Sequence, residues 1–557
     1  MIPSLLLSVL ANPSAGAIPV GGDGPLAGTV VQVNERLIVR WYRVDDVLEN
    51  FEDLRVLDYG EQVDRLTLTA TKGWLTLGVQ ADEVTLFANR YFLDEVETWE
   101  RDLLDPALSS PWPAAFVRLE KVYAQAQGAS GELRLGDTYV SFGRGIALAL
   151  VRNSEIDIDT SVRGARGVVH LGAWDLSVVT GFTNPQQVLL ENPNLDMGPD
   201  DLHEVAAVRV ERFGPVAAGL HAVTWKFARA SDDGSPFARY GQVPDVAVVG
   251  GNVEASGVGG LDLYLEGDWF GYRSADLFVE EEPRPGYALY GSTSVYPGRF
   301  TVLLEAKRYL GTERMNAFAT PWGYEVAAPP SLDYERAITE DSSAEVNSND
   351  IAGARLKVQY AGREGLLVPS LSLGAFRDAD LGGLHFNGSA ETIAHPVAGV
   401  TWIAGDVHVL ANAGARADVR DGDVRGDLTL HGDLDVVVPV GALGHLELGG
   451  AVLRFRWGEN DIQQTDYWDV THSLALHHGE RWSFLVHQDF SDNPLVRSTG
   501  NLGEDLYLAG EVQFKPTPAV TTSLFAGAYK AGIRCAGGQC RSVPGFKGLR
   551  LSVEGSF

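Results

Sequence analysis

The sequence lacks any apolar run that could cross a membrane as a helix. A membrane helix needs about 20 consecutive apolar residues, and the longest apolar run, Ile146–Val151, is much shorter. Helical apolar periodicity is also almost absent. A helical membrane protein is therefore excluded, but a membrane β-barrel is not, because its strands carry lipid-facing residues only at alternate positions.

Basic residues are scarce as well. The chain has 44 Lys and Arg against 74 Asp and Glu, which gives a formal net charge of −30. No basic stripe is present that could neutralise phosphates, so we predict no nucleic-acid partner. A soluble acidic surface and acidic extracellular loops would produce the same charge, and a soluble secreted β protein therefore remains the competing interpretation.

Cysteine is limited to Cys535 and Cys540, in Cys-Ala-Gly-Gly-Gln-Cys. An even count and a close spacing in an exported chain favour a local disulfide. The alternative is a metal site, but two thiolates are half of a structural zinc set, and no histidine lies nearby. We predict the disulfide.

The amino-terminal residues indicate export. A short apolar stretch is followed by Ala15-Gly-Ala17, so residues 1–17 look like a signal peptide, although Lys and Arg are missing from its first residues. Residues 18–61 form a lead with a first strand over 28–43 and an ambiguous segment, a short helix or a lumen-filling piece, over 45–61. Residues 62–557 show no linker and are predicted to form one domain.

From Val63 onward, strands of about ten residues are joined alternately by tight turns and by long polar segments. Lys72-Gly73, Gly172-Ala173 and Gly214-Pro215 are typical of the tight turns, and residues 183–202 and 310–350 of the long ones. Such alternation is typical of membrane barrels, with short periplasmic turns and long extracellular loops. We predict an all-β fold, a single large antiparallel transmembrane β-barrel of about 24 strands, with about 22–26 possible.

The last ten residues alternate in the same way. Leu549, Leu551, Val553 and Phe557 fall on one side of a strand that ends the chain. This pattern resembles the closing strand and assembly signal of bacterial outer-membrane barrels. It predicts the outer membrane of a Gram-negative bacterium as the location, with membrane lipid, lipopolysaccharide and the barrel-assembly machinery as partners.

Aromatic residues gather at predicted strand ends, as in the girdles of membrane barrels. They are Trp74, Trp174, Trp482, Phe213 and Trp402 beside short turns, and Trp225, Phe227, Trp269, Phe270, Tyr309, Phe376, Trp457 and Trp468 at the opposite ends.

Charged residues inside the predicted strands are expected to face the lumen, since a charge in hydrocarbon would cost about 2–4 kcal/mol. The predicted lumen-lining set is Arg65, Arg118, Glu120, Arg134, Arg209, Glu211, Glu254, Glu266, Arg355, Lys357, Arg454 and Arg456. These residues could select solutes, or they could simply pair across strands.

No catalytic, cofactor or metal site is predicted. His472, His477, His478 and His487 cluster near a turn without a carboxylate at useful spacing. Asp157, Asp159 and Glu280–Glu282 could bind calcium or bridge lipopolysaccharide, but no calcium-ligand spacing is present, so solvated loop acid is the preferred interpretation. No nucleophile elbow, phosphate loop or zinc-hydrolase motif occurs, and the chain is not predicted to be an enzyme.

Three segments carry a resemblance: Gly136–Leu150 with its Phe-Gly-Arg-Gly strand, Arg163–Val168, and the two-cysteine segment Arg534–Gly545. Over most of the mature chain they are similar to an uncharacterised family of large outer-membrane proteins, domain of unknown function 6029. The resemblance implies a barrel and no known activity.

The predicted function is a porin-like passive channel for small solutes, or a barrel that accommodates a ligand or partner protein. The alternative is a plugged structural or adhesive surface protein that acts through long acidic loops. Residues 18–61 and 310–350 are the segments expected to narrow the lumen, because a barrel of this width otherwise encloses an aqueous channel.

Overall fold

A computed structural model describes most of the barrel wall and parts of its interior. The described residues are 18–19, 28–44, 57–87, 114–153, 156, 158–186, 203–226, 245–273, 285–312, 327, 330, 351–362, 365–378, 391–421, 426–457, 466–493, 505–530, 532–536, 539–543 and 545–556. The predicted signal peptide and Phe557 lie outside them.

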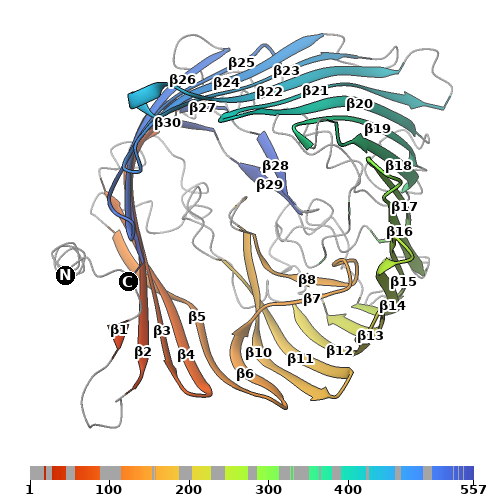
Figure 1. Cartoon of the computed structure of the whole chain (residues 1–557). Helices are drawn as coiled ribbons and strands as arrows, with labels where there is room; N and C mark the ends of the chain where they lie inside the picture. The colour runs from red at the N-terminus through yellow and green to blue at the C-terminus, as the bar shows by residue number, and fades with distance from the viewer. Residues whose placement is uncertain are drawn as a thin grey trace, which may run out of the picture.

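Twenty-four antiparallel strands form a closed barrel (Figure 1). In chain order they are β2 (Val30–Val44), β3 (Leu57–Lys72), β4 (Leu75–Phe87), β5 (Ala114–Gly128), β6 (Gly131–Thr138), β10 (Ile158–Leu171), β11 (Trp174–Pro185), β12 (Glu204–Arg212), β13 (Val216–Lys226), β14 (Asp245–Val258), β15 (Leu261–Arg273), β16 (Gly286–Val295), β17 (Phe300–Leu310), β18 (Ile351–Tyr360), β19 (Leu367–Asp378), β20 (Glu391–Ala404), β21 (Val407–Arg420), β22 (Asp427–Pro439), β23 (His445–Arg456), β24 (Tyr467–His478), β25 (Trp482–Ser491), β26 (Leu506–Thr517), β27 (Val520–Tyr529) and β30 (Phe546–Ser556).

The last strand closes the barrel against the first. β30 pairs with β27 on one side and with β2 on the other, where Ile38 lies opposite Ser552 and Trp41 opposite Leu549. The predicted fold and strand number are therefore confirmed. Leu57–Glu61 belongs to β3, so this end of the ambiguous segment is part of the wall.

Tight turns occupy one end of the barrel. Gly73, Gly172 and Gly405 lie in such turns with φ of 58°, 68° and 63°, a backbone conformation that glycine adopts without a steric penalty. Most connections at the other end are longer, such as residues 186–203 between β11 and β12. The predicted alternation of short and long connections therefore describes the two ends of the barrel.

Several small elements are not among the 24 strands of the ring. β7 (Val140–Phe142) and β8 (Leu148–Leu150) form an inward hairpin between β6 and β10, inside the ring in Figure 1. β9 (Arg152–Asn153) pairs with β10, β1 (Ile18–Pro19) pairs with β2, and β28 (Gly532–Ala536) and β29 (Gln539–Val543) form a separate hairpin. η6 (Gly441–Leu443) is a short 3-10 turn. Among the described residues, no helix has the length and apolarity needed to span a membrane.

Side chains alternate between the two faces of the wall. On β13, Val223 and Trp225 are buried under the inward hairpin, whereas Leu220 is 73% exposed. On β15, Phe270 is buried and its neighbour Trp269 is exposed. Since successive residues of a strand point to opposite faces, these pairs define an inward and an outward face for each strand.

The predicted aromatic girdle is supported for some members at each end. At the tight-turn end, Trp174, Trp402 and Trp482 are exposed on the outward face of their strands, and Trp74 and Phe213 are exposed beside the turns. At the opposite end, Trp269 and Trp468 are exposed, but four others face inward and are buried: Trp225, Phe270, Tyr309 and Phe376. The period-two alternation accounts for the difference, because position near a strand end does not say which face a ring occupies.

Candidate functional site: the inward hairpin and the wall beneath it

The chain leaves the wall at Asp137, near the end of β6. The Asp137 carboxylate is buried and accepts hydrogen bonds from the Val122 backbone N–H at 2.6 Å, the Asn184 side-chain amide at 2.7 Å and the Ser161 hydroxyl at 3.0 Å. Arg163 Nη2 lies 3.1 Å from the same carboxylate. These contacts connect β5, β6, β10 and β11 at the point where the inward segment begins.

A buried lysine, Lys121, binds the chain where the inward segment rejoins the wall at β10. Lys121 Nζ donates to the Ser161 hydroxyl at 3.0 Å and the Asn184 carbonyl at 2.8 Å, and it lies 3.3 Å from Asp159 Oδ1. Tyr139, just after β6, donates to the same Asp159 oxygen at 2.6 Å. Burial and the nearby Asp159 carboxylate raise the pKa of Tyr139 well above its usual value, so its hydroxyl stays protonated and remains a donor. Asp159 is thus buried and paired, whereas it was predicted to be a solvated acidic residue of a loop. Asp157 and Glu280–Glu282 lie outside the described residues.

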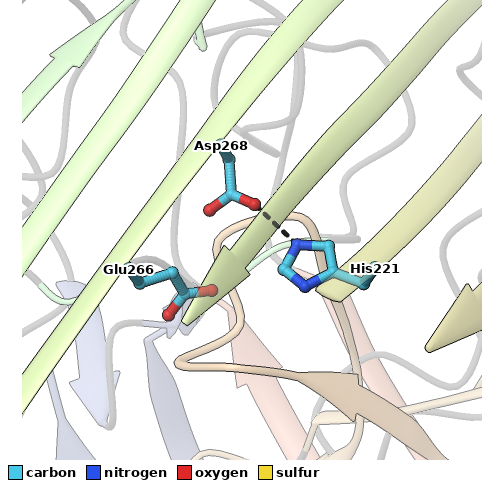
Figure 2. A group of neighbouring side chains, drawn as sticks. All are labelled: His221, Glu266 and Asp268. Carbon is cyan, nitrogen blue, oxygen red and sulfur yellow. Dashed lines mark hydrogen bonds and ion pairs between the residues drawn. The ribbon is translucent and has the colours of Figure 1, made fainter. Parts of the chain in front are cut away.

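The tip of the hairpin contacts β15. Phe142-Gly-Arg-Gly145, predicted as a strand, forms the turn between β7 and β8, with Gly143 at φ 56°. The Arg144 backbone N–H donates to Glu266 Oε2 at 2.8 Å, and the Tyr264 hydroxyl donates to the same oxygen at 2.5 Å. Glu266 lies beside His221 and Asp268 on the inward face (Figure 2). The hairpin is therefore held at its tip by a wall carboxylate.

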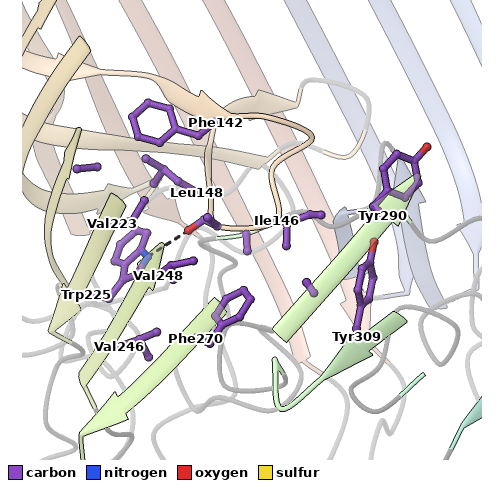
Figure 3. Close-up of a cluster of buried hydrophobic side chains, with 14 of the residues drawn as sticks. Phe142, Ile146, Leu148, Val223, Trp225, Val246, Val248, Phe270, Tyr290 and Tyr309 are labelled. Atoms are coloured by element: carbon purple, nitrogen blue, oxygen red, sulfur yellow. Dashed lines mark hydrogen bonds between the residues drawn. The ribbon is translucent and has the colours of Figure 1, made fainter. Parts of the chain in front are cut away.

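Apolar packing fixes the rest of the hairpin. Phe142, Ile146 and Leu148 are at most 3% exposed, and they belong to one cluster with inward residues from β10 to β20 (Figure 3). The Trp225 indole N–H donates to the Ala147 carbonyl at 3.4 Å. The longest apolar run of the chain therefore packs against the inside of the wall and is not a wall strand.

Nine residues of the predicted lumen-lining set lie on the inward face of their strands. They are Arg65, Arg118, Arg134, Arg209, Glu211, Glu254, Glu266, Arg355 and Lys357. Several pair across or along strands: Arg65 Nε lies 2.9 Å from Asp82 Oδ2, Arg355 Nε lies 3.0 Å from Glu305 Oε2, and Arg209 Nη2 lies 2.9 Å from Glu211 Oε1. Glu120 is buried at a β-bulge, where its carbonyl accepts from Arg163 and Asn184.

Arg454 and Arg456 differ from the prediction. Arg454 lies opposite Leu430 on β22 and Trp468 on β24, both exposed on the outward face, and its guanidinium lies 5.1 Å from the Trp468 ring centre. Arg456 shares the face of Arg454 because it is two residues further along β23. Both therefore point out of the barrel, at the end with the long connections.

The remaining predicted sites are only partly described. Cys535 and Cys540 lie opposite each other in the β28–β29 pair; the disulfide itself remains a prediction, because their side chains lie outside the described part. Leu549 and Leu551 are exposed on the outward face of β30, and Val553 shares that face. Of the predicted histidine cluster, His477 lies 3.3 Å from Glu447 and His472 lies 3.0 Å from Gln488.

Sequence reasoning missed the group His221, Glu266 and Asp268. Among the described residues, it is the one group of three or more metal-ligating side chains with suitably close ligand atoms. The only local signal was Glu266-Gly-Asp268, two carboxylates on one face of a strand.

Comparisons with known proteins give a fold likeness only. No family model and no curated protein matches the chain, so the resemblance to domain of unknown function 6029 gains no support. The outer-membrane protein opdK of Pseudomonas aeruginosa is similar over 70% of this chain and 94% of its own, at 14% identity and a TM-score of 0.37.

Two further solved structures are similar over more of the chain. OccAB3 of Acinetobacter baumannii covers 94% of this chain and 99% of its own, at 11% identity and a TM-score of 0.35. The P pilus tip assembly intermediate PapC-PapD-PapK-PapG of E. coli covers 94% and 60%, at 9% identity and a TM-score of 0.48. Likeness at this level does not indicate a substrate or a partner.

Proposed function

We propose that the protein is an integral barrel of a Gram-negative outer membrane and acts as a porin-like passive channel for small solutes. In this proposal, the segment between β6 and β10 narrows the lumen. Support comes from three features of the structure: the outward face, the inward face at the tight-turn end, and the packing of the inward hairpin.

The outward face favours a membrane environment. Large apolar side chains such as Val117 (71% exposed), Leu220 (73%) and Leu289 (52%) point away from the wall on strands around the ring. Soluble proteins rarely expose contiguous apolar surface of this kind, and a closed barrel leaves no unpaired strand edge, as lipid requires. Arg454 and Arg456, beside Trp468 and near the long connections, suit contact with anionic headgroups such as those of lipopolysaccharide.

The main support for a channel is the exposure of charged and polar side chains inside the ring. Glu254, Glu447 and His477 lie on inward faces near the tight turns, and the Glu447 and His477 side chains are 52% and 39% exposed. Charged and polar side chains are exposed inside a barrel only where water reaches them. In the proposal, water therefore fills this end of the lumen, as a channel requires.

Two segments restrict the lumen in this proposal. The inward hairpin covers part of the wall from β10 to β20 through its apolar cluster. Within the predicted narrowing segment 310–350, Ala327 belongs to the same cluster, and the Pro330 carbonyl accepts from the inward Tyr309 hydroxyl at 3.1 Å. A barrel of this width needs such fillers if small solutes are to be selected.

The test is single-channel conductance of the refolded full-length protein in a planar bilayer. Stable steps that increase with salt concentration are expected for a passive channel. Insertion without conductance would contradict the channel and favour a plugged structural or adhesive barrel. A protein that stays soluble without detergent and does not insert would contradict the membrane proposal itself.

A further inference from the structure

We propose that His221 on β13 and Glu266 and Asp268 on β15 form a divalent-cation site beneath the tip of the inward hairpin. One ligand atom from each of the three side chains lies within 4.8 Å of the other two (Figure 2). The site does not depend on whether the lumen conducts.

A glycine on the strand between β13 and β15 makes this approach possible. His221 lies opposite Gly250 on β14, and Gly250 lies opposite Asp268 on β15, so the three residues form one row across the wall. A Cβ at position 250 would lie 1.8 Å from Asp268 Oδ1. Without that side chain, His221 Nε2 reaches across a whole strand to within 2.6 Å of Asp268 Oδ1.

Each side chain has a buried polar atom that finds no partner among the described residues. The residues are 3–4% exposed, and within the described part of the chain His221 Nδ1, Glu266 Oε1 and Asp268 Oδ2 make no hydrogen bond. A buried polar atom left unsatisfied costs about 1–3 kcal/mol, and more when it carries charge. A single cation between these side chains would take one lone pair from each carboxylate and one from the imidazole.

The mixed donor set favours a transition-type ion. Imidazole nitrogen with carboxylate oxygen is typical of Zn²⁺ and Mn²⁺ sites, whereas Ca²⁺ and Mg²⁺ prefer oxygen alone. Around tetrahedral Zn²⁺, with bonds of about 2.0–2.2 Å, ligand atoms lie about 3.4 Å apart. Shifts of about 1 Å would therefore close the group around an ion, and the His221–Asp268 hydrogen bond would lengthen as the ion enters.

Two positively charged arginines lie near the three side chains and oppose the binding of further positive charge. Arg209, opposite His221 on β12, is paired with Glu211, and the Arg144 guanidinium lies 4.6 Å from the Tyr264 ring centre. The competing arrangement is a protonated His221 that itself supplies the positive charge between the two carboxylates. The experiment must separate these two.

A bound cation would hold the hairpin. Glu266 Oε2 accepts from the Arg144 N–H at 2.8 Å, and its other oxygen, Oε1, is the atom left for the ion. A Cβ on Gly143 would lie 2.0 Å from that Oε1, and the Phe142 ring lies 5.8 Å from the His221 ring. The hairpin tip thus covers the site, and the ion, once bound, fixes the carboxylate that holds the tip.

The test measures metal binding by the full-length protein in detergent. The protein is stripped with a chelator, equilibrated with Zn²⁺ or Mn²⁺, dialysed, and assayed for metal content and, by competition with a coloured chelator, for affinity. Asp268→Asn and Glu266→Gln keep side-chain size. Glu447→Gln, which changes an inward carboxylate beside His477, is the matched control.

We expect one ion per chain in the wild type and in Glu447→Gln, with affinity at least about tenfold weaker in the two site variants. Zn²⁺ should also raise the thermal unfolding midpoint of the wild type and not that of Asp268→Asn. A stripped wild type that takes up no ion, or no more than Asp268→Asn, overturns the proposal. If the variants do not fold, absence of uptake by the wild type alone still overturns the proposal.

Discussion

Loosening the inward hairpin should change the channel in a calculable way. Leu148 is fully buried between the hairpin and the wall, in the cluster with Val223 and Phe270. Truncating a buried leucine to alanine costs about 2–5 kcal/mol. With a central value of about 3 kcal/mol acting on the docked hairpin, Leu148→Ala should increase the undocked fraction about a hundredfold, since each 1.4 kcal/mol is about a factor of ten.

Single-channel recording provides the assay. A docked hairpin narrows the lumen, so undocking should appear as a higher-conductance state whose occupancy rises about a hundredfold in Leu148→Ala. Leu289→Ala is the matched control, because Leu289 points outward on β16 and is 52% exposed. An unchanged distribution of conductance levels, in a Leu148→Ala protein that folds and inserts, would show that the hairpin does not restrict the pore.

Other predictions concern the wall and the β28–β29 hairpin. Asp82→Asn removes the buried carboxylate that contacts Arg65 at 2.9 Å, so the free energy of unfolding in denaturant titration should fall by about 3 kcal/mol; a loss below about 1 kcal/mol would mean that the pair is effectively solvated. Arg454→Leu should change this free energy by less than about 1 kcal/mol, because the side chain lies outward at an interface depth; a larger loss would place it in an internal pair. Cys535 and Cys540 should resist thiol labelling in the unfolded protein until a reductant is added; labelling without reductant would exclude the disulfide.

Local features of the chain determined the barrel. Alternation of apolar and polar residues, the glycines at tight turns such as Gly73 and Gly172, and the terminal pattern of Leu549 and Leu551 depend only on neighbours in sequence. A strand needs only period two, and a tight hairpin needs a residue that tolerates positive φ. Strand number and closure were therefore predictable.

The face of a side chain was less predictable, because one residue of register reverses it. Arg454 was expected in the lumen and points outward, whereas Trp225 and Phe270 were expected in the girdle and lie under the hairpin. Each of these residues is placed correctly in its strand. The face depends on pairing with the neighbouring strands, and the sequence of one strand does not contain that pairing.

Only the tertiary structure decided where Ile146–Val151 lies and which residues meet beneath it. An apolar run after a strand predicts another wall strand. Its inward course depends on contacts between residues far apart in the sequence, such as Asp137 with Asn184. His221 and Asp268 are far apart in sequence and meet because Gly250 stands between them in the row. The sequence determined the barrel through local periodicity, and long-range pairing determined its interior.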